Sequence, residues 1–453
     1  MIQKCLEVVL IPLLRLLLQV FFRQIEVTGA QTIPHDAPVI YTPNHINSVL
    51  DGLLARVFLP RDPRTLAKAT LWDVTALRPL LAAVNAIPVY RQQDSSDPAY
   101  AANNQDMFSS CYDALVEKAC IVLFPEGQSH SESELQPLKT GAARIALGAE
   151  QRDGPLGVHI IPVGLNFDAK QKFRSRVLIS IGQPIDPLDV PGRADPEDRA
   201  AVDQVTERIE EGIKAVTVNY PSWEEANIIG RAADLYASQQ AVESVEARLA
   251  TEFAIHKELA DAYSEMKVSY ARRVGRIVNA VNAYDRLLKV LSIEHEHVIQ
   301  EHPKLLQAIF SLRKLSLFVI RVPLALLGLF LNAAPYFLTT MTRYIKVPPD
   351  RASTTKLVAG IFLYPLCWTL QAMLFGSELI PPSVWWLLAP LSGVSALLFQ
   401  ERHTQLLDEL RTYLKLKSHS EMKQELEQRL EEVTIEVAEF LEIFANMKRN
   451  PGN

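Results

Sequence analysis

Cysteine is scarce in this sequence and shows no paired spacing. The chain has four cysteines among its 453 residues, and they stand at positions 5, 111, 120 and 367. Without a C-x-x-C pair, the sequence indicates neither a zinc ribbon nor a disulfide framework. We therefore expect a reducing location that faces the cytosol.

An excess of positive charge is also absent. The formal net charge is −6, whereas proteins that bind nucleic acid carry a strongly basic surface. We therefore expect no nucleic-acid partner.

Two kinds of catalytic motif are missing as well. "GQSHS" (127–131) lacks the closing glycine of a G-x-S-x-G nucleophile elbow, so Ser129 is a poor candidate for a serine hydrolase. His45, Asp51, Glu126 and His130 are of the types that bind metals, but no H-E-x-x-H or similar ligand spacing supports a metal site. We predict neither a metal nor a bound cofactor.

Apolar residues are abundant. They make up 48% of the chain, and the mean hydropathy is +0.06. Segments 357–376 and 379–399 contain no charged residue, and each is long enough to cross a bilayer. Only two residues separate them, which predicts a hairpin. Basic residues flank it on both sides, so the positive-inside rule places both of its ends in the cytoplasm.

Two further apolar stretches are less regular. Arg321, Pro323, Asn332 and Pro335 interrupt the run that precedes the hairpin, and this favours a broken or re-entrant helix pair over a simple span. The N-terminal stretch is amphipathic and is interrupted by charged residues. We interpret it as an interfacial helix or as a helix packed on the following domain.

Short apolar runs alternate with helical segments between about residues 37 and 185. The expected strands are "PVIYT", "AIPVYR", "CIVLFP", "HIIPVGLNF" and "RVLISIG". Such alternation indicates the α/β fold class, here a layered domain with a central β-sheet, followed by a helical region and a C-terminal transmembrane hairpin. The expected divisions are an N-terminal amphipathic helix (1–29), the α/β domain (30–196), a helical region (197–310), membrane segments (311–400) and an amphipathic C-terminal helix (401–453).

An ionisable pair closes the first predicted strand. His45 and Asp51 stand six residues apart in "VIYTPNHINSVLDGLL", and on a continuous helix they would point about 240° apart. They meet only if His45 lies in a loop and Asp51 lies just inside the next helix. A histidine held by a carboxylate is suited to general-base chemistry. A capping Asn44 beside a surface histidine remains the alternative.

A second motif follows the strand "CIVLFP". "FPEGQSH" (124–130) places Glu126 and Gly127 in a turn before a helix, an arrangement that often binds anions. Lys139 and Arg144 would add positive charge for a phosphate. The alternative is an ordinary turn followed by a surface helix.

Four motifs, in this order, resemble those of the glycerolipid acyltransferases: "NHINSVLD" (44–51), "IPVYR" (87–91), "FPEGQSH" (124–130) and "IIPVGL" (160–165). The resemblance covers residues 30–190, and the C-terminal hairpin is similar to the branch that includes fungal glycerol-3-phosphate acyltransferases. The sequence departs from the family at two places. Five residues separate His45 from Asp51 where four are usual, and the third motif lacks its arginine.

The resemblance implies that 30–196 is a catalytic domain and assigns roles to its residues. His45 would act as general base and Asp51 would orient it, while Arg91 would contact the acceptor phosphate. Glu126 and Gly127 would shape the substrate pocket, and Lys139 or Arg91 would compensate for the missing arginine. The basic run "KQKFRSR" (170–176), read as a strand, would turn one charged face to lipid or to coenzyme A, with a solvated hairpin as the alternative.

The implied reaction is acyl transfer in phospholipid biosynthesis. The donor would be acyl-CoA or acyl carrier protein, and the acceptor glycerol-3-phosphate or 1-acylglycerol-3-phosphate. The location would be the cytoplasmic face of an inner membrane or of the endoplasmic reticulum, with several membrane passes. A lysophospholipid remodelling acyltransferase and an inactive membrane scaffold remain the alternatives.

Overall fold

The computed structural model describes residues 2–73, 75, 78–90, 100–189, 195–240, 248–295, 298, 312–376, 381–418 and 420–450. They form two compact units. The first is Met1–Ser222 together with Pro348–Thr354, and the second is Trp223–Val347 together with Thr355–Asn453.

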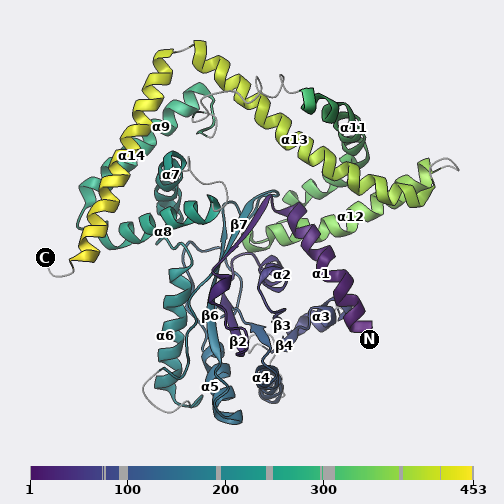
Figure 1. Cartoon of the computed structure of the whole chain (residues 1–453), viewed down its shortest axis with the longest axis vertical. Helices are drawn as coiled ribbons and strands as arrows, with labels where there is room; N and C mark the ends of the chain where they lie inside the picture. The colour runs from purple at the N-terminus through teal and green to yellow at the C-terminus, as the bar shows by residue number, and fades with distance from the viewer. Residues whose placement is uncertain are drawn as a thin grey trace. The chain divides into compact units, whose positions relative to one another are not determined.

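The first unit is built on a sheet of seven strands in the order β1-β7-β6-β2-β5-β3-β4 (Figure 1). Its strands are β1 (Gln24–Thr28), β2 (Val39–Pro43), β3 (Arg64–Lys68), β4 (Ile87–Val89), β5 (Cys120–Val122), β6 (His159–Phe167) and β7 (Arg176–Ile181). The β6–β7 pair is antiparallel and the other pairs are parallel. The expected α/β domain with a central sheet is thus present.

Strand β2 lies in the middle of the sheet, and its burial explains why its sequence reads as an unbroken apolar run. All five of its residues are buried, as is typical of parallel strands that are covered on both faces. The sequence pattern did not predict strands β1 and β3. Both mix charged or polar residues with apolar ones and are only partly buried, so they lack the pattern of a central strand.

Helices cover both faces of this sheet. They are α1 (Ile2–Phe21), α2 (Val49–Phe58), α3 (Arg78–Ala83), α4 (Tyr100–Val116), α5 (Gly141–Asp153) and α6 (Arg199–Ala215), with the short helices η1 (Ala30–Thr32) and η2 (Ala69–Asp73). Ile40, Ile121 and Ile160 share one apolar core with α4, α5 and α6. Side chains alternate along a strand, so the flanking Tyr41 faces the other side, where its hydroxyl donates to the carbonyl of Pro60 after α2.

Helix α6 places the domain boundary later than the sequence suggested. The expected boundary fell near residue 196, but Val205, Ile209 and Ile213 of α6 are buried in the core of the sheet unit. The unit accordingly extends to Ser222. A polar stretch rich in proline and aspartate precedes α6, and its composition signals a loop rather than the end of a core.

Helix α1 packs on the sheet unit. Leu14, Leu18 and Phe21 are buried, and Arg15 donates from Nη2 to the carbonyl of Val57 at 2.8 Å. Of the two interpretations of the N-terminus, a helix packed on the domain describes these contacts. Its other face, with Val8 and Val9, is exposed.

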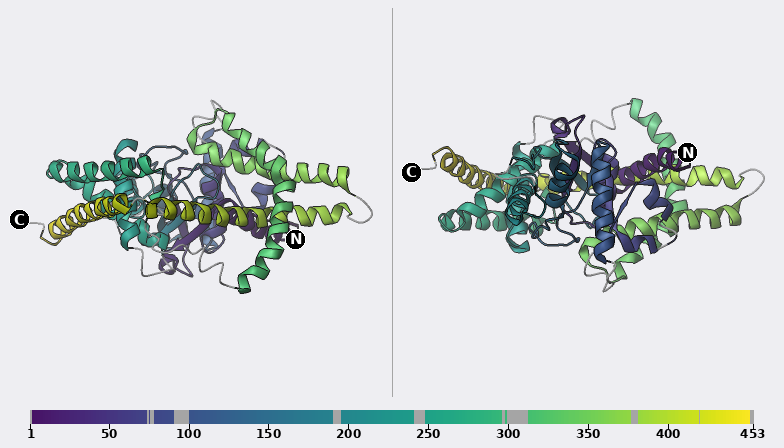
Figure 2. Two further views of the ribbon diagram at one scale, coloured as in Figure 1. Left: turned by 90° about the horizontal axis from the view of Figure 1, so that it is seen from above. Right: turned by 90° about the horizontal axis from the view of Figure 1, so that it is seen from below.

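The second unit is helical. It contains α7 (Trp223–Gln240), α8 (Arg248–Met266), α9 (Ala271–Leu291), α11 (Leu312–Thr340), η6 (Met341–Tyr344), most of α12 (Ala352–Phe375), α13 (Pro382–Ser418) and α14 (Ser420–Arg449). Helix α14 lies against α7, α8 and α9 (Figure 2). Val433, Val437 and Phe440 of α14 are buried there, so the C-terminal amphipathic helix is a packed helix.

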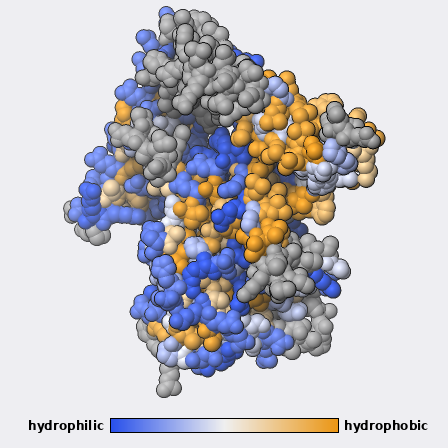
Figure 3. Space-filling view, turned by 45° about the vertical axis from the view of Figure 1, so that its right-hand side comes forward, coloured by the Kyte–Doolittle hydropathy of each residue, from blue (hydrophilic) through white to orange (hydrophobic). Residues whose placement is uncertain are grey.

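Three helices among the described residues are long and apolar enough to cross a membrane: Val322–Tyr344, Pro349–Phe375 and Pro382–Glu401. Large apolar side chains such as Phe330, Phe362 and Leu374 are exposed on them. Figure 3 shows that apolar surface gathers over a broad area on one face of the molecule. The second and third of these helices are the two arms of the expected hairpin.

The expectation of a broken or re-entrant pair before the hairpin was wrong, because α11 is one continuous helix. Pro335 has no N–H, so the carbonyl of Leu331 loses its partner one turn later. Gln371 of α12 supplies that partner at 2.8 Å. Asn332 is satisfied as well, since it donates to Gly328 and Ala389 and accepts from the indole of Trp368. Hydrogen bonds from neighbouring helices thus satisfy the polar groups that Pro335 and Asn332 introduce into α11.

Candidate active site

The candidate site lies where parallel strands end. Strands β2, β5 and β6 are parallel neighbours, so the loops that follow them emerge at the same edge of the sheet. His45 follows β2, the turn 124–127 follows β5, and Lys170 follows β6. The topology therefore brings together three segments that are far apart in the sequence.

The loop between β2 and α2 places His45 against Asp51. Asp51 lies in the first turn of α2, and its Oδ2 is 3.0 Å from Nδ1 of His45. Ser48 precedes α2 with a φ of 52°, a conformation that L residues rarely adopt. This turn accommodates the additional residue between His45 and Asp51. The two side chains meet in the geometry that the sequence required, with the histidine in a loop and the aspartate inside the helix.

The carboxyl of Asp51 is fully buried. Burial raises its pKa, while its hydrogen bond and charge interaction with His45 oppose that rise. The backbone N–H of Asn47 donates to the same Oδ2 at 2.6 Å. Because Oδ2 accepts from Nδ1, the neutral imidazole keeps its lone pair on Nε2, as a general base requires.

Two further contacts fix the histidine loop. Both the amide nitrogen and the amide oxygen of the buried Asn44 side chain bind the backbone of Leu165 on β6. The ring of Phe124 stacks on His45 with centroids 4.1 Å apart. Asn44 therefore anchors the loop to the neighbouring strand β6 and does not cap a helix.

Glu126 joins the two motifs. Its Oε1 accepts from the backbone N–H of His45 at 2.6 Å, and its Oε2 accepts from the N–H of Gln136 and contacts Nε2 of His130. The backbone N–H of His130 donates in turn to the carbonyl of His45. Both oxygens of Glu126 thus bind protein groups, and this carboxylate orients the loops.

Gly127 and Lys139 lie together in the turn after β5. Gly127 has a φ of +75°, and a Cβ there would come within 3.2 Å of the Lys139 side chain. The backbone N–H of Lys139 donates to the carbonyl of Pro125 at 2.7 Å. Arg144, on α5, instead lies 3.8 Å from Glu197 in an exposed pair. Arg91 is outside the described residues.

Lys170 was not recognised as part of this site from the sequence. Its Nζ donates to the carbonyls of Ile46 and His130 at 3.1 and 3.4 Å, and to the hydroxyl of Ser131 at 3.2 Å. Burial lowers its pKa, and the charges of Asp51, Asp350 and Glu132 oppose that change. The signal that would have identified it is topological: it follows a strand parallel to β2.

The alternating basic strand expected at 170–176 is absent. The structure has turns there, and β7 begins only at Arg176. Arg174, with a φ of 65°, donates to carbonyls at the C-terminal end of α1. Arg176 pairs with Asp168 at 2.9 Å. The two arginines therefore stabilise the fold instead of forming one charged face.

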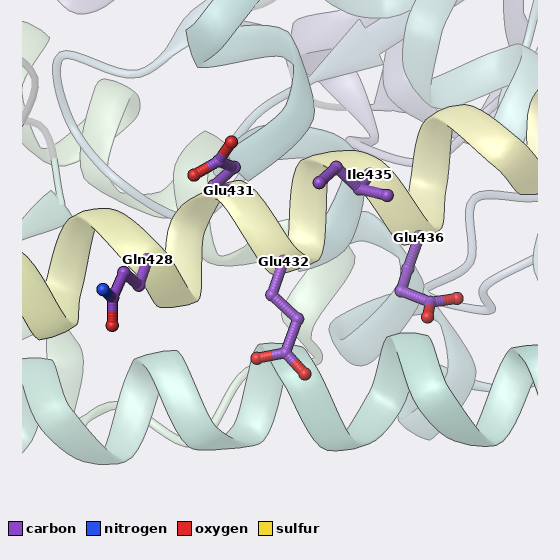
Figure 4. A pocket seen from close by; sticks show the side chains of 5 residues that line it. All are labelled: Gln428, Glu431, Glu432, Ile435 and Glu436. Carbon is purple, nitrogen blue, oxygen red and sulfur yellow. The ribbon is translucent and has the colours of Figure 1, made fainter.

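No group of three or more His, Cys, Asp or Glu side chains among the described residues is placed to hold a metal ion. A hollow of about 340 Å³ lies on α14, lined by Gln428, Glu431, Glu432, Ile435 and Glu436. Figure 4 shows these side chains pointing to different sides of one helix. They do not converge on a common point.

Comparison with known proteins connects this site to a family. Residues 24–166 match the family model described as Acyltransferase. The glycerol-3-phosphate O-acyltransferase 2 of Saccharomyces cerevisiae is 28% identical over 292 residues, which are 60% of this chain and 38% of that protein. The glycerol-3-phosphate O-acyltransferase 1 of the same yeast is 34% identical over 136 residues, which are 29% of this chain and 18% of that protein.

The matched region contains the dyad and the Phe-Pro-Glu-Gly turn, whereas Lys170 lies just beyond it. The chain spans well under half the length of these two yeast relatives. A solved structure, the 1-acyl-sn-glycerophosphate (LPA) acyltransferase of Thermotoga maritima, is 21% identical and covers 44% of this chain and 76% of its own, with a TM-score of 0.32.

Proposed function

We propose, from the premise that this chain belongs to the glycerolipid acyltransferase family, that it moves an acyl chain from a thioester to a glycerol hydroxyl. The acceptor in this proposal is glycerol-3-phosphate or 1-acylglycerol-3-phosphate, and the donor is acyl-CoA or acyl carrier protein. The observation that carries the proposal is the 3.0 Å contact between His45 Nδ1 and Asp51 Oδ2 at the loop edge of the sheet.

The geometry supports a direct transfer. Nε2 of His45 takes the proton of the acceptor hydroxyl as its oxygen attacks the thioester carbonyl. The C–O bond forms, the C–S bond breaks, and the departing thiolate receives the proton from the imidazolium. Asp51 holds the imidazole in the required tautomer and stabilises the imidazolium in between. No acyl-enzyme is needed.

Further residues are assigned to substrate binding within this proposal. Backbone N–H groups of the turn at Gly127 are suited to stabilise the tetrahedral oxyanion. Arg91 and Lys139 would hold the acceptor phosphate, since phosphate oxygens prefer charged donors. Glu126 holds this turn against the loop of His45 through a hydrogen bond to the His45 N–H. It therefore affects substrate binding indirectly, by positioning these two loops.

The apolar helices support a membrane location. Three described helices are long and apolar enough to span, and the acyl products of this reaction partition into bilayers. We place the catalytic unit on the cytoplasmic face, because the charged residues that flank the hairpin follow the positive-inside rule. Both substrates then meet at one surface, which raises their effective concentration.

An acceptor panel tests the proposed function. The chain in membranes is supplied with acyl-CoA or, in parallel reactions, with acyl carrier protein that carries the same acyl chain. Each donor is combined in turn with glycerol-3-phosphate, lysophosphatidate or lysophosphatidylcholine. We expect turnover with one of the first two acceptors, and a rate lower by about 10²- to 10⁴-fold in membranes carrying His45→Ala. Turnover with lysophosphatidylcholine alone would indicate the remodelling reaction. No turnover with any acceptor and either thioester donor would refute the proposal.

Replacement of Arg91 by alanine tests the assignment of the phosphate contact. Loss of a charged hydrogen bond of about 1.5–3 kcal/mol predicts an acceptor KM raised about 10- to 100-fold. We expect kcat at saturating acceptor to stay within about twofold, because the contact is the same in ground and transition states. Acceptor titrations of Arg91→Ala and Arg91→Lys measure this. A fall in kcat with unchanged KM would contradict the assignment.

A further inference from the structure

Residues Pro348–Thr354 belong to the sheet unit, although the residues before and after them belong to the helical unit. This segment consists of the short helix η7 (Pro349–Arg351) and the first turn of α12. Asp350 and Ser353 are buried, with 6% and 0% exposure. Polar side chains with so little exposure require partners.

These partners are the loops of the candidate active site. Oδ2 of Asp350 accepts from the hydroxyl of Ser129 at 2.5 Å, in the turn that follows β5. The hydroxyl of Ser353 donates to the backbone carbonyl of Lys170. The hydroxyl of Thr354 donates to the carbonyl of Asn47 at 3.5 Å, in the loop that carries His45. Three residues of one short segment thus contact all three catalytic loops.

The side chain of Lys170 also connects these loops by hydrogen bonds. Its ammonium group binds Ile46 of the histidine loop and His130 and Ser131 after the Phe-Pro-Glu-Gly turn. Its own carbonyl accepts from the side chain of Asn47 at 3.4 Å. Since the N–H of Asn47 binds Asp51, a displacement of Lys170 would be transmitted to the dyad.

We propose that Asp350, Ser353 and Lys170 are positioning residues of the acyl-transfer site, and that the Pro348–Thr354 segment fixes the histidine loop against the Phe-Pro-Glu-Gly turn. This inference rests on the function proposed above. It follows that the first turn of α12, a candidate membrane helix, helps to position the catalytic groups. The chemistry is then inseparable from the C-terminal part of the chain, which the match to the family model does not include.

Two pairs of variants in the full-length chain test this proposal. Asp350→Ala removes the acceptor of the Ser129 hydroxyl, whereas Asp350→Asn keeps an oxygen in its place. We expect kcat to fall about 10- to 100-fold in the alanine variant, as for a displacement of catalytic groups by about 1 Å. The asparagine variant should recover most of that loss, and KM for both substrates should stay within about twofold.

The second pair replaces Lys170 by methionine or arginine. The titratable groups that act on Asp51 are His45 and Lys170, and those that act on Lys170 are Asp51, Asp350 and Glu132. The charge of Lys170 lowers the pKa of Asp51, so removal of the ammonium group favours protonation of that carboxyl. The acidic limb of the kcat–pH profile should therefore move to higher pH in Lys170→Met. Lys170→Arg keeps the charge and should leave that limb near its wild-type position. A merely structural lysine would not move the limb.

Two variants serve as matched controls. One is Thr369→Ala on α12, where the hydroxyl donates to the carbonyl of Pro365 in the same helix, and the other is the exposed Asp203→Asn on α6. Both should keep wild-type kcat. Thermal unfolding of each variant identifies a loss of fold, and the conservative partner of each pair then decides the outcome. An active wild type with unchanged kcat and pH profile in Asp350→Ala and Lys170→Met overturns this inference alone. An inactive wild type overturns it together with the proposed function.

Discussion

Replacement of His45 by alanine is expected to lower kcat for acyl transfer about 10²- to 10⁴-fold, the usual contribution of a general base. The physical reason is the position of the ring. Nδ1 is engaged by Asp51, and the side chain is 13% exposed, so Nε2 is the proton acceptor that a substrate hydroxyl would meet. Without the imidazole, the described loop after β2 (44–48) offers no other side chain suited to act as a general base.

The measurement is initial-rate kinetics in membranes with saturating donor and acceptor. His35→Ala is the matched control, since His35 is an exposed histidine in the loop before β2, and it should retain full activity. The donor KM of His45→Ala should change little, because the imidazole acts on the acceptor hydroxyl. Wild-type turnover in His45→Ala would remove His45 from the mechanism.

Replacement of Asp51 by asparagine is expected to lower kcat by a similar factor of about 10²- to 10⁴-fold. The asparagine amide would present an N–H to Nδ1 of His45, and the imidazole would then carry its proton on Nε2. That tautomer has no lone pair where the acceptor hydroxyl binds. Acceptor KM should remain within about twofold, since no substrate group contacts the buried carboxyl.

Stability separates this effect from unfolding. Burial raises the pKa of Asp51, so its favourable contribution to folding is complete only below the unfolded pKa of 3.8 and is lost as the pH rises through the folded value. At neutral pH the uncharged asparagine avoids the free-energy cost of burying a carboxylate. This gain offsets the loss of the Asn47 N–H bond to Oδ2, the position that the asparagine nitrogen takes when it faces Nδ1. We expect the thermal unfolding midpoint of Asp51→Asn to equal or exceed that of the wild type. Asp106→Asn, exposed on α4, is the control, and a much lower midpoint in Asp51→Asn would contradict this account.

The sequence predicted which residues meet at the centre of the candidate site, but not the residues that surround them. His45, Asp51 and the Phe-Pro-Glu-Gly turn stand out because each follows a buried apolar strand, and a local pattern is enough to locate them. Lys170 and Asp350 contact the same loops through tertiary structure alone. No local sequence pattern around Asp350 predicts its contact with Ser129, which lies 221 residues away. Only the folded chain shows that the two residues meet.

For the fold as well, the sequence predicted the buried centre better than the partly exposed elements around it. Strands β2, β5 and β6 are covered on both faces, and their apolar runs predicted them. Strands β1 and β3 read as polar because their neighbours leave them partly exposed. In "KQKFRSR" the alternating charges resembled a strand, but Arg174 adopts a positive φ and turns the chain. Alternation alone does not distinguish a strand from a loop whose cations bind carbonyls.

The continuous α11 has a consequence for how its residues vary together. The carbonyl of Leu331 depends on Gln371 only because residue 335 is a proline. Pro335→Ala would supply an N–H within the helix, and Gln371→Leu would then cost less than it does beside the proline. The two substitutions are therefore expected to be non-additive in a double-mutant cycle. The proline of α11 and the amide of α12 are thus coupled in their effect on stability through one carbonyl group.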